Sequence, residues 1–475
     1  MTTSPNVIPL MTQLTIAIIV DNPKRDLRGL TLLSHELVKR GARVLLVPMY
    51  QQGYDLPLLA PDIVIVNYAR DNNRALLETY KHLNYRIAVL DTEGGVLSED
   101  GADSTINWAK NINITGLGSL IDYYCFWGSE VYKAFHEYSG IDNKALAVTG
   151  CPRYDLCCVP WSAVLSYKRK DFILVNTNFS AINPQFTKSA EDESRIFKQL
   201  GWDEAYIDSL FDALKAVFPK YLDTIEHIAQ SFPDRIIQIR PHPFENPSIY
   251  VTRFSNLKNI IIDGDGDIFD TISASSCIVH LNCGSSVDAL RLNKLPISLE
   301  YLNNDCLRNH APLPSKLSCQ ALSREMLVHL LTDIPQTTAR FDFKKAFSEI
   351  EHWYYLNDGK AAARIADFLM SPSNFSAKIS QTSYCLSIKG GRSKTSLPQL
   401  AKGMVGMLLG SKMASFLTGL LISSRSHKNI DLLFVKELLA RFIQLDDKKP
   451  VRIQYAKNPY SHASMSTIDI SKAQK

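Results

Sequence analysis

Long apolar runs are missing from this sequence of 475 residues. A membrane-spanning helix needs about 18 or more consecutive apolar residues, and the nearest candidate, residues 403–424, is interrupted by Lys412 and by several serines and glycines. The N-terminus also lacks the basic segment of a signal peptide, and its short apolar run ends in "DNPKRD". We therefore expect a cytoplasmic protein.

Paired cysteines and strong charge are missing as well. The nine cysteines include no CxxC pair, and their number is odd, so neither a zinc site nor a disulfide framework is expected. A net charge of +4 is small for this length and does not indicate a nucleic-acid partner. These absences predict reduced thiols and no metal.

Short apolar strands that alternate with amphipathic helices make up most of the chain. Examples are "LTIAIIV" at 14–20 and "DIVIVNY" at 62–68, and the pattern restarts at "FILVNTNFS", residues 172–180. Strands that are apolar throughout are buried on both faces, which is typical of parallel sheets covered by helices. The length exceeds what one hydrophobic core holds. We therefore predict an α/β protein with two tandem Rossmann-like domains and a C-terminal helical extension.

The composition suggests where these parts begin and end. We predict a first domain at 1–155, a second at 156–370, a polar linker at 371–396 and a helical tail at 397–475. The tail combines apolar helical faces with scattered lysines and arginines. Such a segment can lie on an anionic membrane surface or pack against the two domains, and the sequence leaves both placements open.

In open α/β sheets ligands bind at the carboxyl ends of the strands, so the residues that follow each strand are candidates for a site. No GxGxxG turn follows the first strand, which argues against a fold that binds the pyrophosphate of a dinucleotide. Asp91 and Glu93 follow a later strand in "LDTEGG" and are either a general acid, base or nucleophile or an acidic turn. Glu93 is our first choice. Asp155, near Arg153 in "TGCPRYD", is either part of a hinge or a second carboxylate that faces the cleft.

Four polar residues follow the first two strands of the second half. Asn176 and Asn178 in "VNTNFS" offer amides to a nucleotide or sugar, or cap the next helix. In "RPHP", Arg240 offers a fixed cation to a phosphate, and His242 is held between two prolines. We expect His242 to donate a proton or a hydrogen bond to a leaving phosphate.

Two further motifs extend this candidate site. Ser285 and Ser286 in "CGSSVDAL" open a helix, where hydroxyls and backbone N–H groups either bind an anion or form an ordinary cap. Glu300 ends the strand "LPISLE" and is placed to accept hydrogen bonds from ribose hydroxyls.

These motifs resemble those of a known group of enzymes. "RPHP", "CGSSVDAL" and "LPISLE" resemble the His-Pro and Ser-Ser motifs of GT-B glycosyltransferases that use CMP-activated acidic sugars, such as bacterial sialyltransferases and Kdo transferases. "LDTEGG", "TGCPRYD" and "NTNFSAINP" are similar to bacterial surface carbohydrate biosynthesis proteins, and the resemblance covers about residues 14–370. It implies a CMP phosphate on His242, Ser285 and Ser286, and a ribose on Glu300. The catalytic carboxylate would then be Glu93 or Asp91, with Asp155 as a second in a retaining enzyme.

The resemblance implies a glycosyltransferase that moves a Kdo-like sugar from a CMP donor to a polysaccharide or glycolipid acceptor. It implies no cofactor besides the donor, and the tail would suit peripheral contact with the cytoplasmic face of the inner membrane. A polyol-phosphate transferase, a sugar-nucleotide epimerase and a non-catalytic scaffold for polysaccharide assembly remain alternatives.

Overall fold

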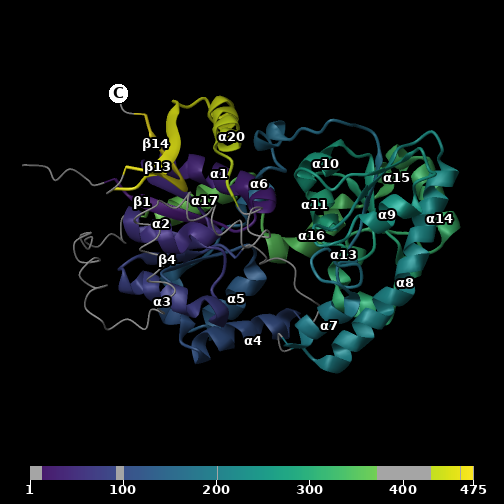
Figure 1. Ribbon diagram of the computed structural model, residues 1–475, viewed down its shortest axis with the longest axis horizontal. Coiled ribbons are helices and arrows are strands. Elements are labelled where there is room, and N and C mark those ends of the chain that lie inside the picture. Colours follow the sequence, from purple (N-terminus) through teal and green to yellow (C-terminus); the bar gives the residue numbers. More distant parts are fainter. Residues whose placement is uncertain (1–12, 92–100, 200–201, 372–428, 460–461, 474–475) are drawn as a thin grey trace, which may run out of the picture.

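A computed structural model describes residues 13–91, 101–199, 202–371, 429–459 and 462–473, with the backbone alone for 101–104. Two sheets, each with helices on both faces, form two lobes that lie side by side (Figure 1). This confirms the predicted α/β class with two Rossmann-like domains.

The first sheet has the strand order β13-β14-β2-β1-β3-β4-β5-β6, and the six strands from the N-terminal part of the chain run parallel. Its central strands β1 and β3 are buried along their whole length because helices cover both faces. The N-terminal elements are β1 (Thr15–Val20), α1 (Pro23–Lys39), β2 (Arg43–Pro48), α2 (Gln52–Leu59), β3 (Ile63–Val66), α3 (Arg74–His82), β4 (Arg86–Val89), α4 (Gly101–Ile114), β5 (Tyr123–Phe126), α5 (Ser129–Tyr138), β6 (Leu146–Val148) and α6 (Pro152–Asp155).

The second sheet is parallel throughout, in the order β12-β11-β10-β7-β8-β9. The order reverses between β7 and β10, so the chain leaves these two neighbouring strands in opposite directions. Its elements are β7 (Ile173–Asn176), α7 (Ala190–Gln199), α8 (Glu204–Ser231), β8 (Ile237–Arg240), α9 (Ser248–Arg253), β9 (Ile260–Ile262), α10 (Ile268–Ala274), β10 (Cys277–His280), α11 (Ser285–Arg291), β11 (Leu295–Ser298), α12 (Asp305–His310), α13 (Pro312–Lys316), β12 (Cys319–Gln320), α14 (Arg324–Thr332) and α15 (Ile334–Arg340).

The next two helices return to the first domain. α16 (Phe343–Tyr354) contacts α5, and α17 (Ala361–Leu369) packs along α1. α1 also lies very close to α6: a Cβ on Gly29 would come within 2.7 Å of the Arg153 backbone nitrogen. A side chain at this position would therefore push the two helices apart.

The C-terminal part differs from the predicted helical tail. It contains α20 (Leu432–Leu445), which packs on α1, followed by the antiparallel hairpin β13 (Val451–Lys457) and β14 (Ser464–Lys472). β14 pairs antiparallel with β2 and so extends the first sheet (Figure 1, yellow beside purple). The prediction missed the alternating pattern of "STIDISK", in which Ile468 and Ile470 are fully buried. The predicted linker and the amphipathic stretch 403–424 lie outside the described residues.

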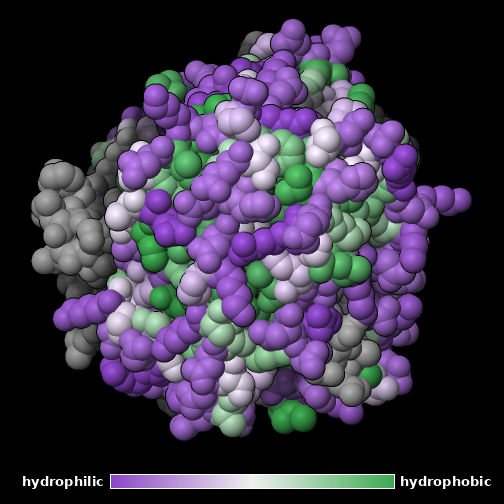
Figure 2. Space-filling model, turned by 90° about the vertical axis from the view of Figure 1, so that its right-hand side faces the viewer, coloured by the Kyte–Doolittle hydropathy of each residue, from purple (hydrophilic) through white to green (hydrophobic). Residues whose placement is uncertain are grey.

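The outer face of the second domain is mostly polar, with apolar side chains in small separate groups (Figure 2). Within the described residues, no helix has the length and apolar character that a membrane span requires.

Candidate functional site

A row of polar side chains crosses the carboxyl edge of the second sheet. The strand register places the last residues of five strands side by side, namely Gln320, Ser298, His280, Asn176 and Arg240. The residues before them are largely apolar and buried. The side chains of the sheet are thus largely apolar up to this edge, and the last residue of each of these strands carries a hydrogen-bonding group.

The centre of this row is the point where the strand order reverses. In doubly wound sheets such a reversal opens a crevice between the loops of the two strands, and ligands bind there. The loops after β7 and β10 are joined across it, because Asn176 Nδ2 donates to Ser285 Oγ at 2.8 Å and Asn178 Nδ2 donates to the Asn282 carbonyl at 3.4 Å. The structure therefore brings together Asn176, Asn178 and Ser285, three of the predicted site residues, and their contact with a ligand stays a prediction.

Three buried oxygens at this edge have no hydrogen-bond partner among the described residues: Asn176 Oδ1, Ser286 Oγ and Ser298 Oγ. Buried polar groups are normally satisfied, so unpaired ones at a strand edge call for an explanation. Ser285, in contrast, donates its hydroxyl to Cys283 Sγ at 3.1 Å. At the reversal point, Ser286 Oγ and Asn176 Oδ1 can thus still form hydrogen bonds with a ligand.

The "RPHP" loop lies next to this crevice. The His242 backbone N–H donates to Thr177 Oγ1 at 3.2 Å, which ties the loop to the end of β7. The imidazole Nδ1 accepts from the Phe244 N–H at 3.3 Å, and burial lowers the pKa of His242. The neutral ring then carries its proton on Nε2, so at neutral pH the side chain offers a hydrogen bond rather than a positive charge.

Glu245 holds the two loops together and was assigned no role from the sequence. Its carboxylate is 2% exposed and accepts from Thr177 Oγ1 at 2.8 Å, from the Phe179 N–H at 2.6 Å and from the Tyr250 hydroxyl. Burial raises the pKa of Glu245. Its position between two loop prolines in "PFENP" was the only sequence signal.

Arg240 is engaged within the protein. Its guanidinium donates to the carbonyls of Asp265 and Gly266, at 2.8 and 2.7 Å, and to Thr271 Oγ1 at 3.1 Å. It therefore fixes the loop between β9 and α10, and its contact with a phosphate stays a prediction.

Glu300 is held by three neighbours. It accepts from Ser315 Oγ at 2.6 Å, from Arg308 Nε at 2.9 Å and from Asn303 Nδ2 at 3.1 Å. The hydrogen bonds from these side chains outweigh desolvation and lower the pKa of Glu300, which keeps it ionised. Its contact with a ribose stays a prediction.

Asp155 is buried and holds the start of α17, and its proposed catalytic role stays a prediction. It is 3% exposed, and its two oxygens accept from the backbone N–H groups of Ala361 and Ala362 at 2.9 and 2.7 Å. It therefore caps α17 from the first domain. Arg153 pairs with Asp288 at 3.1 Å instead of with Asp155.

Asp91 is buried at the end of β4. Its backbone is left-handed, with φ of 50°, and its carboxylate accepts from the Tyr124 hydroxyl at 3.1 Å. It lines a small cavity with Trp127 and Arg153 at the carboxyl edge of the first sheet. Glu93, the first choice for the catalytic carboxylate, lies outside the described residues.

The carboxyl edges of the two sheets face each other. Arg28, in the first turns of α1, pairs with Asp270 at the start of α10 at 2.8 Å, and Arg153 of α6 pairs with Asp288 of α11. All four helices begin just after a strand of their sheet. This facing arrangement of two Rossmann-like domains is that of the GT-B fold.

Comparisons with solved structures give distant likenesses. They include a putative UDP-N-acetylglucosamine 2-epimerase from Listeria monocytogenes (13% identity, 78% of this chain and 99% of that chain, TM-score 0.47). A UDP-GlcNAc 2-epimerase from Neisseria meningitidis bound to UDP-GlcNAc matches at 13% identity (75% and 100% of the chains, TM-score 0.45). The wall teichoic acid polymerase TagF matches at 12% identity (75% and 88%, TM-score 0.47). No family model and no curated protein matches the sequence. The fold assignment rests on the strand orders of the two sheets.

Proposed function

We propose that this chain is a sugar-nucleotide-dependent enzyme that binds its nucleotide at the carboxyl edge of the second sheet, between β7 and β10. The observation that carries the proposal is the row of polar strand ends across the point of strand-order reversal, with three buried oxygens that have no partner among the described residues. A bound phosphate and sugar would bring polar partners to this edge from the face that meets the first domain.

The proposed reaction is transfer of an acidic, Kdo-like sugar from a CMP donor to a surface polysaccharide or glycolipid acceptor at the cytoplasmic face of the membrane. The polar row contains one cation, Arg240, and its guanidinium is engaged by loop carbonyls. Neutral donors such as His242 Nε2–H and the Ser286 hydroxyl, which has no partner among the described residues, suit the single phosphate of CMP better than a pyrophosphate, which carries more charge. Hydrogen bonds to the phosphate strengthen as the glycosidic bond breaks and charge develops on the leaving group.

A carboxylate in the facing domain would complete the mechanism. Glu93 or Asp91 would accept the proton of the attacking acceptor hydroxyl. An epimerase, which needs no acceptor, is the alternative on the same site.

A nucleotide panel tests the proposal on the full chain. We expect CMP to raise the melting temperature more than UMP or UDP, because a ligand that binds only the folded state stabilises it by mass action. His242→Ala should weaken CMP binding by about tenfold, equivalent to about 1.4 kcal/mol, whereas Ser248→Ala, at an exposed serine on α9, should leave it unchanged. A shift with UDP but not CMP would overturn the proposed donor, and no shift with any nucleotide would overturn the nucleotide site.

Turnover then separates the reactions. A transferase releases CMP from the donor only when an acceptor is present, whereas an epimerase acts on UDP-GlcNAc without one. Consumption of UDP-GlcNAc in the absence of acceptor would favour the epimerase.

A further inference from the structure

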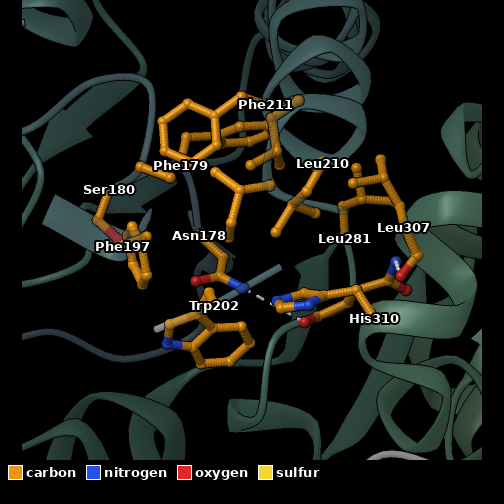
Figure 3. A pocket seen from close by; sticks show the side chains of 14 residues that line it. Asn178, Phe179, Ser180, Phe197, Trp202, Leu210, Phe211, Leu281, Leu307 and His310 are labelled. Carbon is orange, nitrogen blue, oxygen red and sulfur yellow. Dashed lines mark hydrogen bonds between the residues drawn. The ribbon is translucent and has the colours of Figure 1, made fainter. Parts of the chain in front are cut away.

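A cavity of about 160 Å³ opens beside the reversal point of the second sheet (Figure 3). It is enclosed by the loop after β7, the helices α7, α8 and α12, and the loop after β10. Its wall is mainly aromatic and aliphatic and includes Phe179, Phe197, Leu210, Phe211, Leu281 and Leu307. Trp202 stands at its edge and is 47% exposed.

Among the described residues, no charged side chain lines this cavity. Its amides are held by protein partners: Asn178 donates to the Asn282 carbonyl, and Asn282 Nδ2 donates to Asn303 Oδ1 at 2.9 Å and to the Leu307 carbonyl at 3.0 Å. His310 is hydrogen-bonded to the Tyr206 hydroxyl, and burial lowers the pKa of its ring. The cavity is thus uncharged, and few of its polar groups are free for a ligand.

The apolar, uncharged lining favours one chemical class of ligand over others. A phosphate or a sugar ring would lose its hydrogen bonds to water on entering a hydrocarbon wall, and a nucleobase would lose those along its polar edges. An apolar group loses none. An engineered cavity of about 150 Å³ with a similar lining in another protein stays dry and binds benzene or xenon, so this volume suits a group of about six carbons.

We propose that the cavity binds an apolar group of the acceptor, the hydrocarbon portion of a glycolipid next to the sugar that receives the transfer. This rests on the proposed function, because Asn178 lies both in the cavity wall and at the crevice assigned to the nucleotide. A hydrocarbon held here would place the attached sugar beside the donor. The cavity thereby selects a lipid-bearing acceptor over a free polysaccharide.

Two matched probes test this on the full chain: n-hexyl β-D-glucoside and methyl β-D-glucoside, which differ only in the length of their apolar group. We expect calorimetry to give a Kd at least tenfold lower for the hexyl probe, with a change in tryptophan emission that is lost in Trp202→Phe. Equal affinity for both probes, or no binding of either, would overturn the proposal.

Filling the cavity is the matched mutational test. Ala181→Phe places a ring from the lining loop into the space and should abolish hexyl binding, with Leu214→Phe as a second variant if the first fails to fold. Ile196→Phe, at a position on α7 that is 41% exposed and outside the lining, should bind like the wild type. Unchanged hexyl binding in a folded, filled variant would contradict the assignment.

Addition of CMP distinguishes the inference from the proposed function. Hexyl binding that persists at saturating CMP, with normal CMP binding in Ala181→Phe, supports two adjacent subsites. Displacement of the hexyl probe by CMP would overturn the inference and assign the cavity to the nucleotide. Hexyl binding in a chain that does not bind CMP would overturn the acceptor role and the proposed function together.

Discussion

At the scale of single residues, the polar row combines groups for a ligand with groups that only hold the edge together. His280 is of the second kind. It is fully buried, its Nε2 lies 2.9 Å from Ser318 Oγ, and its Nδ1 accepts from the Cys283 N–H at 3.4 Å. Burial lowers its pKa from 6.5 to about 3, so the ring stays neutral at physiological pH. It positions the loop that leads to Ser285.

His280→Gln should therefore change how stability depends on pH. Because the pKa of His280 is lower in the folded chain than in the unfolded chain, its contribution to stability is full above about pH 6.5 and is lost as the pH falls toward 3. Between pH 7 and pH 5 this amounts to about 2 kcal/mol of unfolding free energy. Urea titrations at the two pH values measure how much unfolding free energy is lost from pH 7 to pH 5. We expect this loss to be about 2 kcal/mol smaller in His280→Gln than in the wild type. His329→Gln, at an exposed histidine, serves as control, and an equal loss in both variants would contradict the assignment.

At the scale of elements, the C-terminal hairpin is part of the first domain rather than an appendage. Ile468 and Ile470 of β14 are fully buried, and Arg43 of β2 forms a two-pronged ion pair with Asp469 at 3.1 and 2.8 Å. α20 adds a second contact, because Asp446 accepts from Lys39 of α1 at 2.8 Å. The end of the chain thus covers both an edge of the sheet and one of its helices.

Ile470→Ala should destabilise the protein by about 2–5 kcal/mol, because it removes buried methyl groups and leaves a cavity. Arg452→Ala, on the exposed outer strand β13, should change the unfolding free energy by less than about 0.5 kcal/mol. Chemical denaturation of both variants checks this. A wild-type midpoint for Ile470→Ala would mean that the hairpin is detached in solution.

At the scale of the molecule, the two domains share a hydrophobic core. One cluster of buried residues contains Leu27 and Tyr154 from the first domain and Phe269 and Leu290 from the second. Arg291 of α11 is 1% exposed and reaches the end of α16, where it donates to the carbonyls of Tyr354 and Tyr355, both at 3.0 Å. Its guanidinium also lies over the rings of Tyr154 and Tyr354. We therefore expect the two domains to unfold together.

Arg291→Met should weaken the contact between the two domains. The variant keeps the bulk of the side chain but leaves buried carbonyls without donors, at a cost of about 3–5 kcal/mol. Calorimetry should show one transition for the wild type, and a lower or split transition for Arg291→Met. Arg340→Met, at an exposed arginine, should melt like the wild type. An unchanged single transition in Arg291→Met would contradict the coupling.

Local sequence patterns predicted most of the strands, the helices between them and the polar residues that follow strands. These are local properties: burial on both faces makes a strand apolar, and the end of burial admits the first polar side chain. For that reason Asn176 and Arg240 could be named as candidates before their neighbours were known.

The groups that those residues contact depend on the folded arrangement of the whole chain. Asp155 caps a helix about 200 residues further along the chain, Arg240 binds loop carbonyls, and Glu245 joins two loops that the sequence treats as separate. The hairpin on β2 and the apolar cavity beside the crevice also depend on segments far apart in the chain. A local sequence pattern shows which chemical group a side chain carries. The partner of that group is set by long-range packing, which periodicity and spacing do not encode.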